Sequence, residues 1–232
     1  MKRLAPAVVV LGLIGSSPAS AAETRYAIGD FEQIQVVGPF SVTVRTGRAT
    51  SVMASGDAAA LDAVSVETGG GVLKIQAIAK SRSSWKEDPH PAAKFVVIVP
   101  RLKGLRLLGS GTITASEMRG IATSIFLDGS GQINVTKLAA DGVSVRLNGS
   151  GRVTMAGTAK NFDANVSGSG DLDAAQLAAS DLKLMASSSG VINAWAMRTA
   201  DIKQNGAGSV RVKGKPSCIV ENLGAGTLAC GD

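Results

Sequence analysis

The stretch Leu105-Arg-Leu-Leu-Gly-Ser-Gly-Thr-Ile-Thr-Ala115 decides the fold, because variants of it return along the rest of the chain. Its central Gly-Ser-Gly, or a variant with Ser or Ala substituted, begins at seven positions. These positions are Gly109, Gly129, Gly149, Gly168, Ser188, Gly206 and Gly224. The intervals between them are 20, 20, 19, 20, 18 and 18 residues, which indicates a repeat protein.

Apolar residues flank each tripeptide at fixed distances. Four residues before its first position stand Leu105, Ile125, Val145, Ala164, Leu184, Ile202 and Val220, and four after it stand Ile113, Ile133, Val153, Leu172, Ile192, Val210 and Leu228. The position two before is also apolar, except at Gln204 and Asn222. Polar residues lie between them, and this period of two is typical of strands and not of a helix.

Each repeat therefore reads as a strand, a tight glycine corner and a second strand. One such unit cannot bury its apolar face alone, but stacking places equivalent side chains in interior ladders. The sequence predicts an all-β fold over residues 101–232, a single-stranded parallel β-helix (β-solenoid) of about seven rungs of 18–20 residues. The predicted structural corner glycines are Gly109, Gly111, Gly129, Gly131, Gly149, Gly151, Gly168, Gly170, Gly190, Gly206, Gly208, Gly224 and Gly226.

Residues 28–100 are less regular and predict a β-rich segment that caps the N-terminal end of the array. Strands are expected at 34–37, 40–44, 51–54, 64–66, 72–75 and 95–99, with a short helical turn at 57–63. Residues 80–94 are polar and proline-bearing, and we expect a protruding loop there.

The N-terminus predicts export. Residues 1–21 have a basic head, a short apolar run and small residues at the end, the order of a secretory signal peptide. Cleavage is expected after Ala21 or Ala22, leaving residues 22–232 as a single mature domain in the periplasm or at the surface of a bacterium. No other apolar stretch reaches the roughly 20 residues of a membrane helix, so no transmembrane segment is expected after cleavage.

The two cysteines stand six residues before and six after the first position of the last corner. An even pair in an exported chain predicts a disulfide between Cys218 and Cys230, which would close the last rung. Free thiols and a metal site are the alternatives.

The charge pattern narrows the partners. The net charge is +6, and the Lys and Arg residues are scattered, so no nucleic acid is expected as a partner. An envelope polysaccharide or protein fits an exported chain better. The sequence fixes neither the ligand nor the oligomeric state.

Three stretches resemble one known family. Phe31 to Val44 resembles its opening strands, Gly71-Val-Leu-Lys-Ile75 a following element, and Leu107-Leu-Gly-Ser-Gly111 the start of its repeats. The family is the head GIN domain of putative auto-transporter adhesins, and the similarity covers about residues 30–226. It implies a β-helical fold, an envelope location and an adhesin-like role, with no assigned catalytic residues. Nothing here resembles a C-terminal translocator, so an auto-transporter mechanism is not expected.

The acidic pair Asp171 and Asp173 is a candidate for chemistry. Both face outward on one strand, and paired carboxylates can act on sugars. Arg152 falls one rung below Asp171, so a surface ion pair is the alternative. A calcium-binding roll would need aspartates at the equivalent positions of neighbouring rungs, and these hold other residues.

Two tryptophans and one histidine complete the candidates. Trp195 is expected to face outward, and Trp85 lies in the polar loop; either could contact a ligand. His90, in the same loop, could serve as a base or metal ligand but has no second histidine.

The sequence thus predicts a non-catalytic binding or scaffolding module of the cell envelope, adhesin-like, with no catalytic residue, cofactor or metal. The alternative is a carbohydrate-active enzyme, a lyase or hydrolase on an acidic polysaccharide, using Asp171 and Arg152. A third possibility is an assembly protein that stacks end to end through its last rung.

Overall fold

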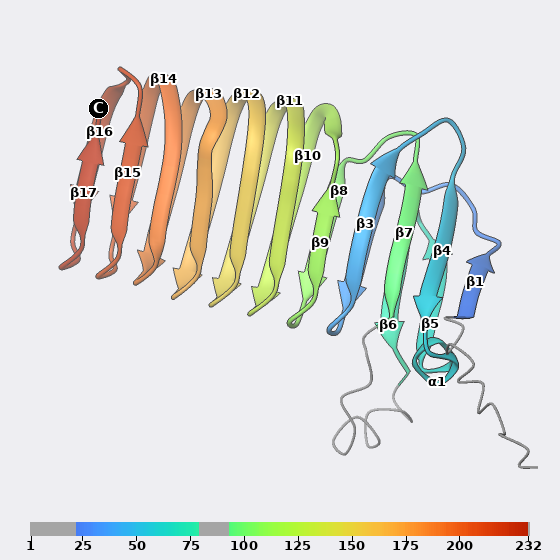
Figure 1. Cartoon of the computed structure of the whole chain (residues 1–232). Helices are drawn as coiled ribbons and strands as arrows, with labels where there is room; N and C mark the ends of the chain where they lie inside the picture. Colours follow the sequence, from blue (N-terminus) through green and yellow to red (C-terminus); the bar gives the residue numbers. More distant parts are fainter. Residues whose placement is uncertain (1–21, 79–92, 232) are drawn as a thin grey trace, which may run out of the picture.

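The computed structural model describes residues 22–78 and 93–231, which form one connected sheet and a short helix (Figure 1). The strands of the N-terminal part are β1 (Ala22–Tyr26), β2 (Gln33–Val37), β3 (Ser41–Thr46), β4 (Ser51–Gly56), β5 (Val64–Gly69), β6 (Val72–Ala77) and β7 (Lys94–Val99), with helix α1 (Ala58–Asp62) between β4 and β5. The array holds β8 (Gly104–Leu108), β9 (Thr112–Ala115), β10 (Met118–Gly129), β11 (Gln132–Gly149), β12 (Arg152–Gly168), β13 (Asp171–Ser188), β14 (Val191–Gln204), β15 (Ser209–Lys213), β16 (Ser217–Asn222) and β17 (Thr227–Cys230).

Parallel pairing between successive turns confirms the β-solenoid. Ile113 pairs in register with Ile133, Ile133 with Val153, and Val153 with Leu172. The same ladder continues through Ile192 and Val210 to Leu228. The predicted number of rungs, about seven, was slightly high. There are seven corners between Gly109 and Gly224, and the chain makes about six turns from the first corner to the last.

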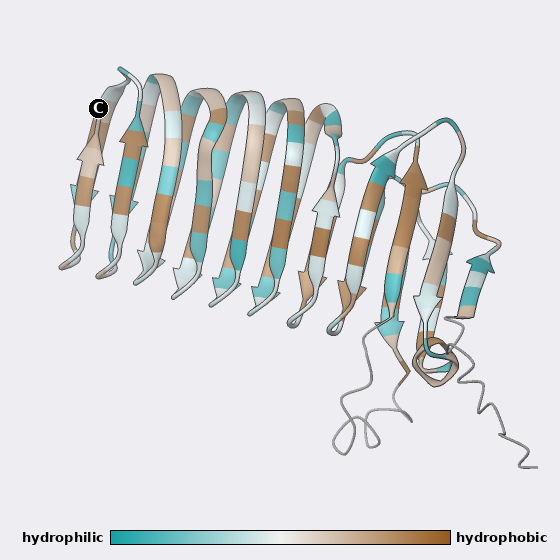
Figure 2. Cartoon of the chain, in the orientation of Figure 1, coloured by the Kyte–Doolittle hydropathy of each residue, from teal (hydrophilic) through white to brown (hydrophobic). Residues whose placement is uncertain are grey.

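Each turn has one tight corner and one curved edge. At the corner the chain reverses through the Gly-Ser-Gly tripeptide. At the other edge it bends without breaking the strand, so that β11 runs unbroken for 18 residues and serves both faces of the solenoid. Register shifts between Val135 and Leu138 accommodate that bend. Apolar and polar bands alternate along the strands (Figure 2), and the inward residues, such as Leu107, Leu127 and Leu147, are fully buried.

The two glycines of a corner are required for different reasons. The first has a positive φ, +118° at Gly109 and +105° at Gly149, which disfavours any residue with a Cβ. The second, such as Gly151, would place a Cβ 2.5 Å from the carbonyl oxygen of the glycine one turn below. The last three corners, which begin at Ser188, Gly206 and Gly224, do not use a positive φ at the first position. At the first of these three corners, the Ser188 hydroxyl accepts a hydrogen bond from the backbone N–H of Gly190 (2.9 Å).

The N-terminal segment contributes a layer that the sequence analysis did not recognise as a rung. β2 and β3 are joined at Gly38, whose φ is +129°, like that of the repeat corners. This layer lies between the pair β6/β7 and the pair β8/β9, and it is parallel to both. Its four inward residues, Ile34, Val36, Val42 and Val44, are buried. The stacking order of the strands therefore differs from their order along the chain.

Antiparallel strands cover the N-terminal end of the stack, as the predicted cap requires. β5 pairs with β6, β4 with β7, and β1 with β4, all antiparallel (Figure 1). The six expected strands and the helical turn are present, and β1 was not anticipated. The expected loop at 80–94 lies outside the described residues, except that Ala93 is buried and Lys94 begins β7. The predicted signal peptide, residues 1–21, also lies outside them.

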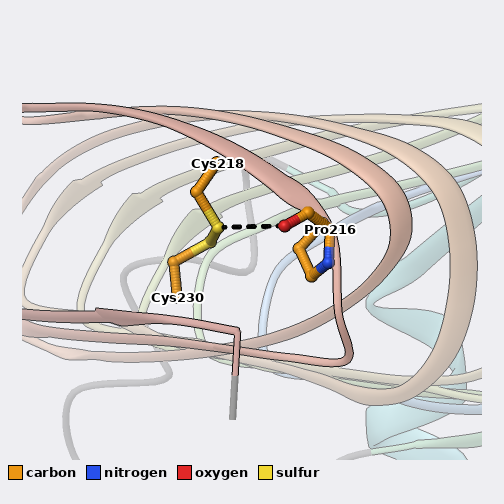
Figure 3. The surroundings of a disulfide bond; sticks show 3 residues. All are labelled: Pro216, Cys218 and Cys230. Atoms are coloured by element: carbon orange, nitrogen blue, oxygen red, sulfur yellow. Dashed lines mark hydrogen bonds between the residues drawn. A yellow bond between two sulfur atoms is a disulfide. The ribbon is translucent and has the colours of Figure 1, made fainter.

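The C-terminal rung is closed by the predicted disulfide. Cys218 in β16 is bonded to Cys230 in β17, with their Cα atoms 6.5 Å apart (Figure 3). The sulfur of Cys218 lies 3.6 Å from the carbonyl oxygen of Pro216, a contact without a hydrogen bond because a disulfide sulfur carries no proton. No further turn covers this rung in the described structure, so every residue of β16 is exposed.

The two polar residues at the end of the inner ladder, Gln204 and Asn222, form hydrogen bonds to the backbone of the corners that follow them. The Nε2 group of Gln204 is buried and donates to the carbonyl oxygen of Gly208 (2.8 Å). Asn222 repeats this contact one turn later, with its Nδ2 donating to the carbonyl oxygen of Gly226 (3.2 Å). The Oε1 atom of Gln204 has no hydrogen-bond partner among the described residues.

No helix within residues 22–78 and 93–231 is long and apolar enough to cross a membrane.

Candidate binding site

The predicted pairing of Arg152 with Asp171 is present. Parallel pairing of β12 and β13 places the two residues side by side, and Arg152 Nη2 donates to Asp171 Oδ2 at 2.7 Å. The backbone N–H of Val191 donates to the other oxygen, Oδ1, at 3.0 Å. These two hydrogen bonds, the Val191 bond first, hold the pKa of Asp171 below its ordinary value.

Asp173 is also engaged locally. Its Oδ1 accepts a hydrogen bond from the backbone N–H of Ala175 at 3.2 Å, and the side chain lies beside a groove of only about 200 Å³. A glycosidase acid needs a raised pKa. The lowered pKa of Asp171 and its two hydrogen bonds instead fit a structural ion pair between neighbouring turns.

The remaining sequence candidates are dispersed. Trp195 is half-buried on β14, and the ammonium of Lys213 lies 4.7 Å from its ring centroid, so a cation already covers one face of the indole. Trp85 and His90 lie outside the described residues. Within the described parts of the chain, no cluster of three or more His, Cys, Asp or Glu side chains could hold a metal ion.

A groove on the other face of the solenoid, formed by the strand segments that precede the corners, was missed by the sequence analysis. It has a volume of about 350 Å³ and crosses β6, β2, β8, β10 and β11. Arg106, Phe126 and Arg146 lie side by side along it, and the guanidinium of Arg106 stacks 4.3 Å from the Phe126 ring centroid. The signal in the sequence was their spacing: each stands three residues before a corner.

A second groove, of about 520 Å³, lies at the curved edge of β10 to β14. Asp181, one of its charged residues, accepts hydrogen bonds from both Arg198 and Thr199, which lower the pKa of Asp181, the Arg198 contribution being the larger. Asp181 therefore already has a cationic partner. The other charged residues of the lining are Asp163 and Lys183.

Comparison with known proteins establishes the family. Residues 30–216 match the family described as Putative auto-transporter adhesin, head GIN domain, and the chain belongs to that family. This confirms the resemblance seen in the sequence. No curated protein matches the chain.

Solved structures agree on the fold. The chain is similar to a protein of Bacteroides fragilis described as a putative adhesin, at 20% identity and a TM-score of 0.83, with 93% of this chain and 98% of that chain covered. It is also similar to a Parabacteroides distasonis protein described as a putative lipid binding protein, at 23% identity and a TM-score of 0.72, with 90% and 96% covered. A putative adhesin of Parabacteroides merdae follows at 16% identity and a TM-score of 0.65, with 90% and 95% covered. At these identities the likeness concerns the fold alone.

Proposed function

We propose that the protein is a non-catalytic binding or scaffolding module of the bacterial cell envelope, which holds its ligand against the outer faces of the solenoid. The observation that carries the proposal is the continuous outer face itself. Side chains there stand at fixed positions in ladders on a rigid sheet, as in the extended binding surfaces of other solenoids.

Several features support the envelope location. Residues 1–21 have the order of a signal peptide, and removal of this segment would leave residues 22–232 as one exported domain. The disulfide between Cys218 and Cys230 is compatible with an extracytoplasmic compartment. The family and two of the similar structures carry adhesin names, which suit a role in binding in the periplasm or at the cell surface.

The enzymatic alternative is weaker on physical grounds. The Asp171 carboxylate accepts two hydrogen bonds in its charged form, so its lowered pKa suits neither a general acid nor a base poised near neutral pH. Turns of 18 to 20 residues also leave short connections, with little chain to enclose a substrate.

The test is a binding survey combined with a turnover assay. The mature protein is applied to an array of envelope polysaccharides and proteins, and bound polysaccharides are then incubated and assayed for new reducing ends or unsaturated products. We expect binding without turnover. Turnover that disappears in Asp171→Ala would refute the proposal in favour of an enzyme, and no binding to any envelope component would refute it as well.

A further inference from the structure

One row of side chains on the groove-bearing face of the solenoid is cationic. Strand pairing places Lys74 beside Gln35, Gln35 beside Arg106, Arg106 beside Phe126, and Phe126 beside Arg146. This row, which we call the cationic ladder, holds three positive charges and no negative charge across five neighbouring strands. The row forms only on folding, because β2 pairs with β6 on one side and with β8 on the other, and these strands are not consecutive in the chain.

The two arginines of the cationic ladder are free to bind an anion. No carboxylate among the described residues lies within ion-pair distance of Arg106 or Arg146, whereas Arg152, Arg198 and Lys203 elsewhere are each paired with an acid. Glu67 on β5 pairs in register with Lys74, at the end of the cationic ladder, and Asp163 on β12 pairs with Ser144. Neither acid forms an ion pair among the described residues. Arg106 and Arg146 are both exposed, so a ligand can reach them.

Phe126 orders the cationic ladder. Its half-buried ring lies between the two arginines, and the guanidinium of Arg106 is stacked on it at 4.3 Å. A planar guanidinium held against a ring loses less conformational entropy on binding than a free side chain. It also keeps its fork of N–H donors available for two parallel bonds to a carboxylate.

The shape of the groove indicates an elongated ligand. Five strands at a spacing of about 4.8 Å give it a length of about 19 Å along the solenoid axis. Gly104 keeps the middle of the groove low, since a Cβ there would lie 3.0 Å from Gln33 and 3.2 Å from the Ser124 hydroxyl. The exposed walls offer hydroxyl groups from Ser124 and Ser144 and amides from Gln33 and Gln35.

We propose that this groove binds an acidic polysaccharide, with sugar carboxylates paired to Arg106 and Arg146 and sugar hydroxyls bonded to the serine and glutamine side chains. The inference rests on the proposed function and names its ligand class. A polymer of uronic acids supplies both carboxylates and hydroxyls at regular intervals along an extended chain, which matches the length and the polar lining of the groove. A lipid headgroup would match the charge, but it supplies no regular row of carboxylates and hydroxyls for the arginine, serine and glutamine side chains along the groove.

The experiment uses the mature protein and measures its affinity for polygalacturonate and alginate oligosaccharides by titration calorimetry. Neutral dextran and vesicles containing phosphatidylglycerol serve as comparison ligands. The double variant Arg106→Gln/Arg146→Gln should bind the uronates about tenfold more weakly or worse, because bonds to charged groups are the strong ones. Binding by the wild-type protein should weaken as salt is added.

The matched control is Arg45→Gln/Arg211→Gln, which removes two exposed arginines, on β3 and β15, from the face of the solenoid opposite the groove. Both double variants remove two positive charges, and neither Arg45 nor Arg211 forms an ion pair among the described residues. We expect uronate affinity to change less than about twofold.

The outcomes separate the two proposals. Equal weakening in both double variants would overturn the inference, since net charge and not the groove would then govern binding. Wild-type protein that binds dextran, vesicles or other envelope components but no uronate would overturn the inference and leave the proposed function standing. Wild-type protein that binds no envelope component at all would overturn both.

Discussion

The glycine corners allow a sharp stability test on one strand. In Gly149→Ala, the new Cβ stands at a residue with φ of +105° and lies 2.5 Å from the carbonyl oxygen of Gly129, one turn below. Gly142, on the same strand β11, lacks a positive φ, and its nearest neighbour to an added Cβ is the Ile121 carbonyl oxygen at 3.6 Å. Gly142→Ala is therefore the matched control.

The magnitude follows from two costs. A positive φ costs a residue with a Cβ about 1–2 kcal/mol, and overpacking against a neighbour that cannot rotate away costs about 1–3 kcal/mol. Gly149→Ala should therefore lower the free energy of unfolding by about 2–5 kcal/mol. Gly142→Ala meets neither cost, and it should leave that free energy unchanged or raise it by about 0.4–1 kcal/mol by restricting the unfolded chain.

Urea unfolding followed by circular dichroism measures both variants. A third variant, Gly151→Ala, separates the two costs, because this residue lacks a positive φ but would place a Cβ 2.5 Å from the Gly131 carbonyl oxygen. It should fall between the other two. If Gly149→Ala unfolds within about 0.5 kcal/mol of Gly142→Ala, the stacked-corner reasoning is wrong.

Three further predictions concern the C-terminal half. Removing the disulfide with Cys218→Ser/Cys230→Ser should destabilise the last rung by about 3 kcal/mol, seen as faster amide exchange in β16 and β17 but not in β11. Gln204→Leu should raise the free energy of unfolding by about 1 kcal/mol, measured by urea unfolding, because it replaces a buried Oε1 that lacks a partner among the described residues. The substitution also removes the hydrogen bond from Nε2 to the Gly208 carbonyl oxygen, but that oxygen still accepts from the backbone N–H of Thr227. Asp171 has a lowered pKa in the folded state, so its stabilising effect is present above the unfolded value of about 3.8 and is lost as pH falls through the folded value. Wild-type protein should therefore lose more stability below that pH than Asp171→Asn, as followed by thermal melts across the acid range.

Control variants and contrary outcomes test the disulfide, Gln204 and Asp171 predictions. Ser150→Ala, at an exposed corner position, is a neutral control for the cysteine pair; uniform exchange along the whole array would contradict a local role for the disulfide. Gln204→Ala would leave a cavity, so it should destabilise while Gln204→Leu stabilises, and the reverse order would refute the ladder interpretation. Identical acid profiles for wild-type protein and Asp171→Asn would show that the carboxylate gains nothing from Arg152 and Val191.

The repeat was predictable because every turn of the array obeys the same local rule. Ile113 and Leu105 recur at fixed offsets from each corner, and alternation with a period of two can be read without knowing any long-range contact. The ion pair of Arg152 with Asp171 followed from that rule, since equivalent positions must stack. The cysteine pair followed in the same way from the last corner.

The layer of β2 and β3 shows the limit of this reasoning. Ile34, Val36, Val42 and Val44 stand at the repeat offsets from Gly38, yet more than fifty residues separate this segment from the array. Its position between β6/β7 and β8/β9 depends on which strand edges remain unpaired after folding. No local pattern encodes that choice.

The amino-acid sequence by itself determined the corner, the inward ladders and the closing disulfide, because each depends on residue type and spacing within one or two turns. Only the tertiary structure decided the order of the N-terminal strands, and with it the cationic ladder. Lys74 and Gln35 join Arg106 there through backbone pairing between distant segments. Arg106, Phe126 and Arg146 share the repeat spacing, but they become one exposed row only when three strands lie in register. The outward faces of a solenoid carry no burial constraint, so their residue types predict no packing, and their function depends on which side chains stacking brings together.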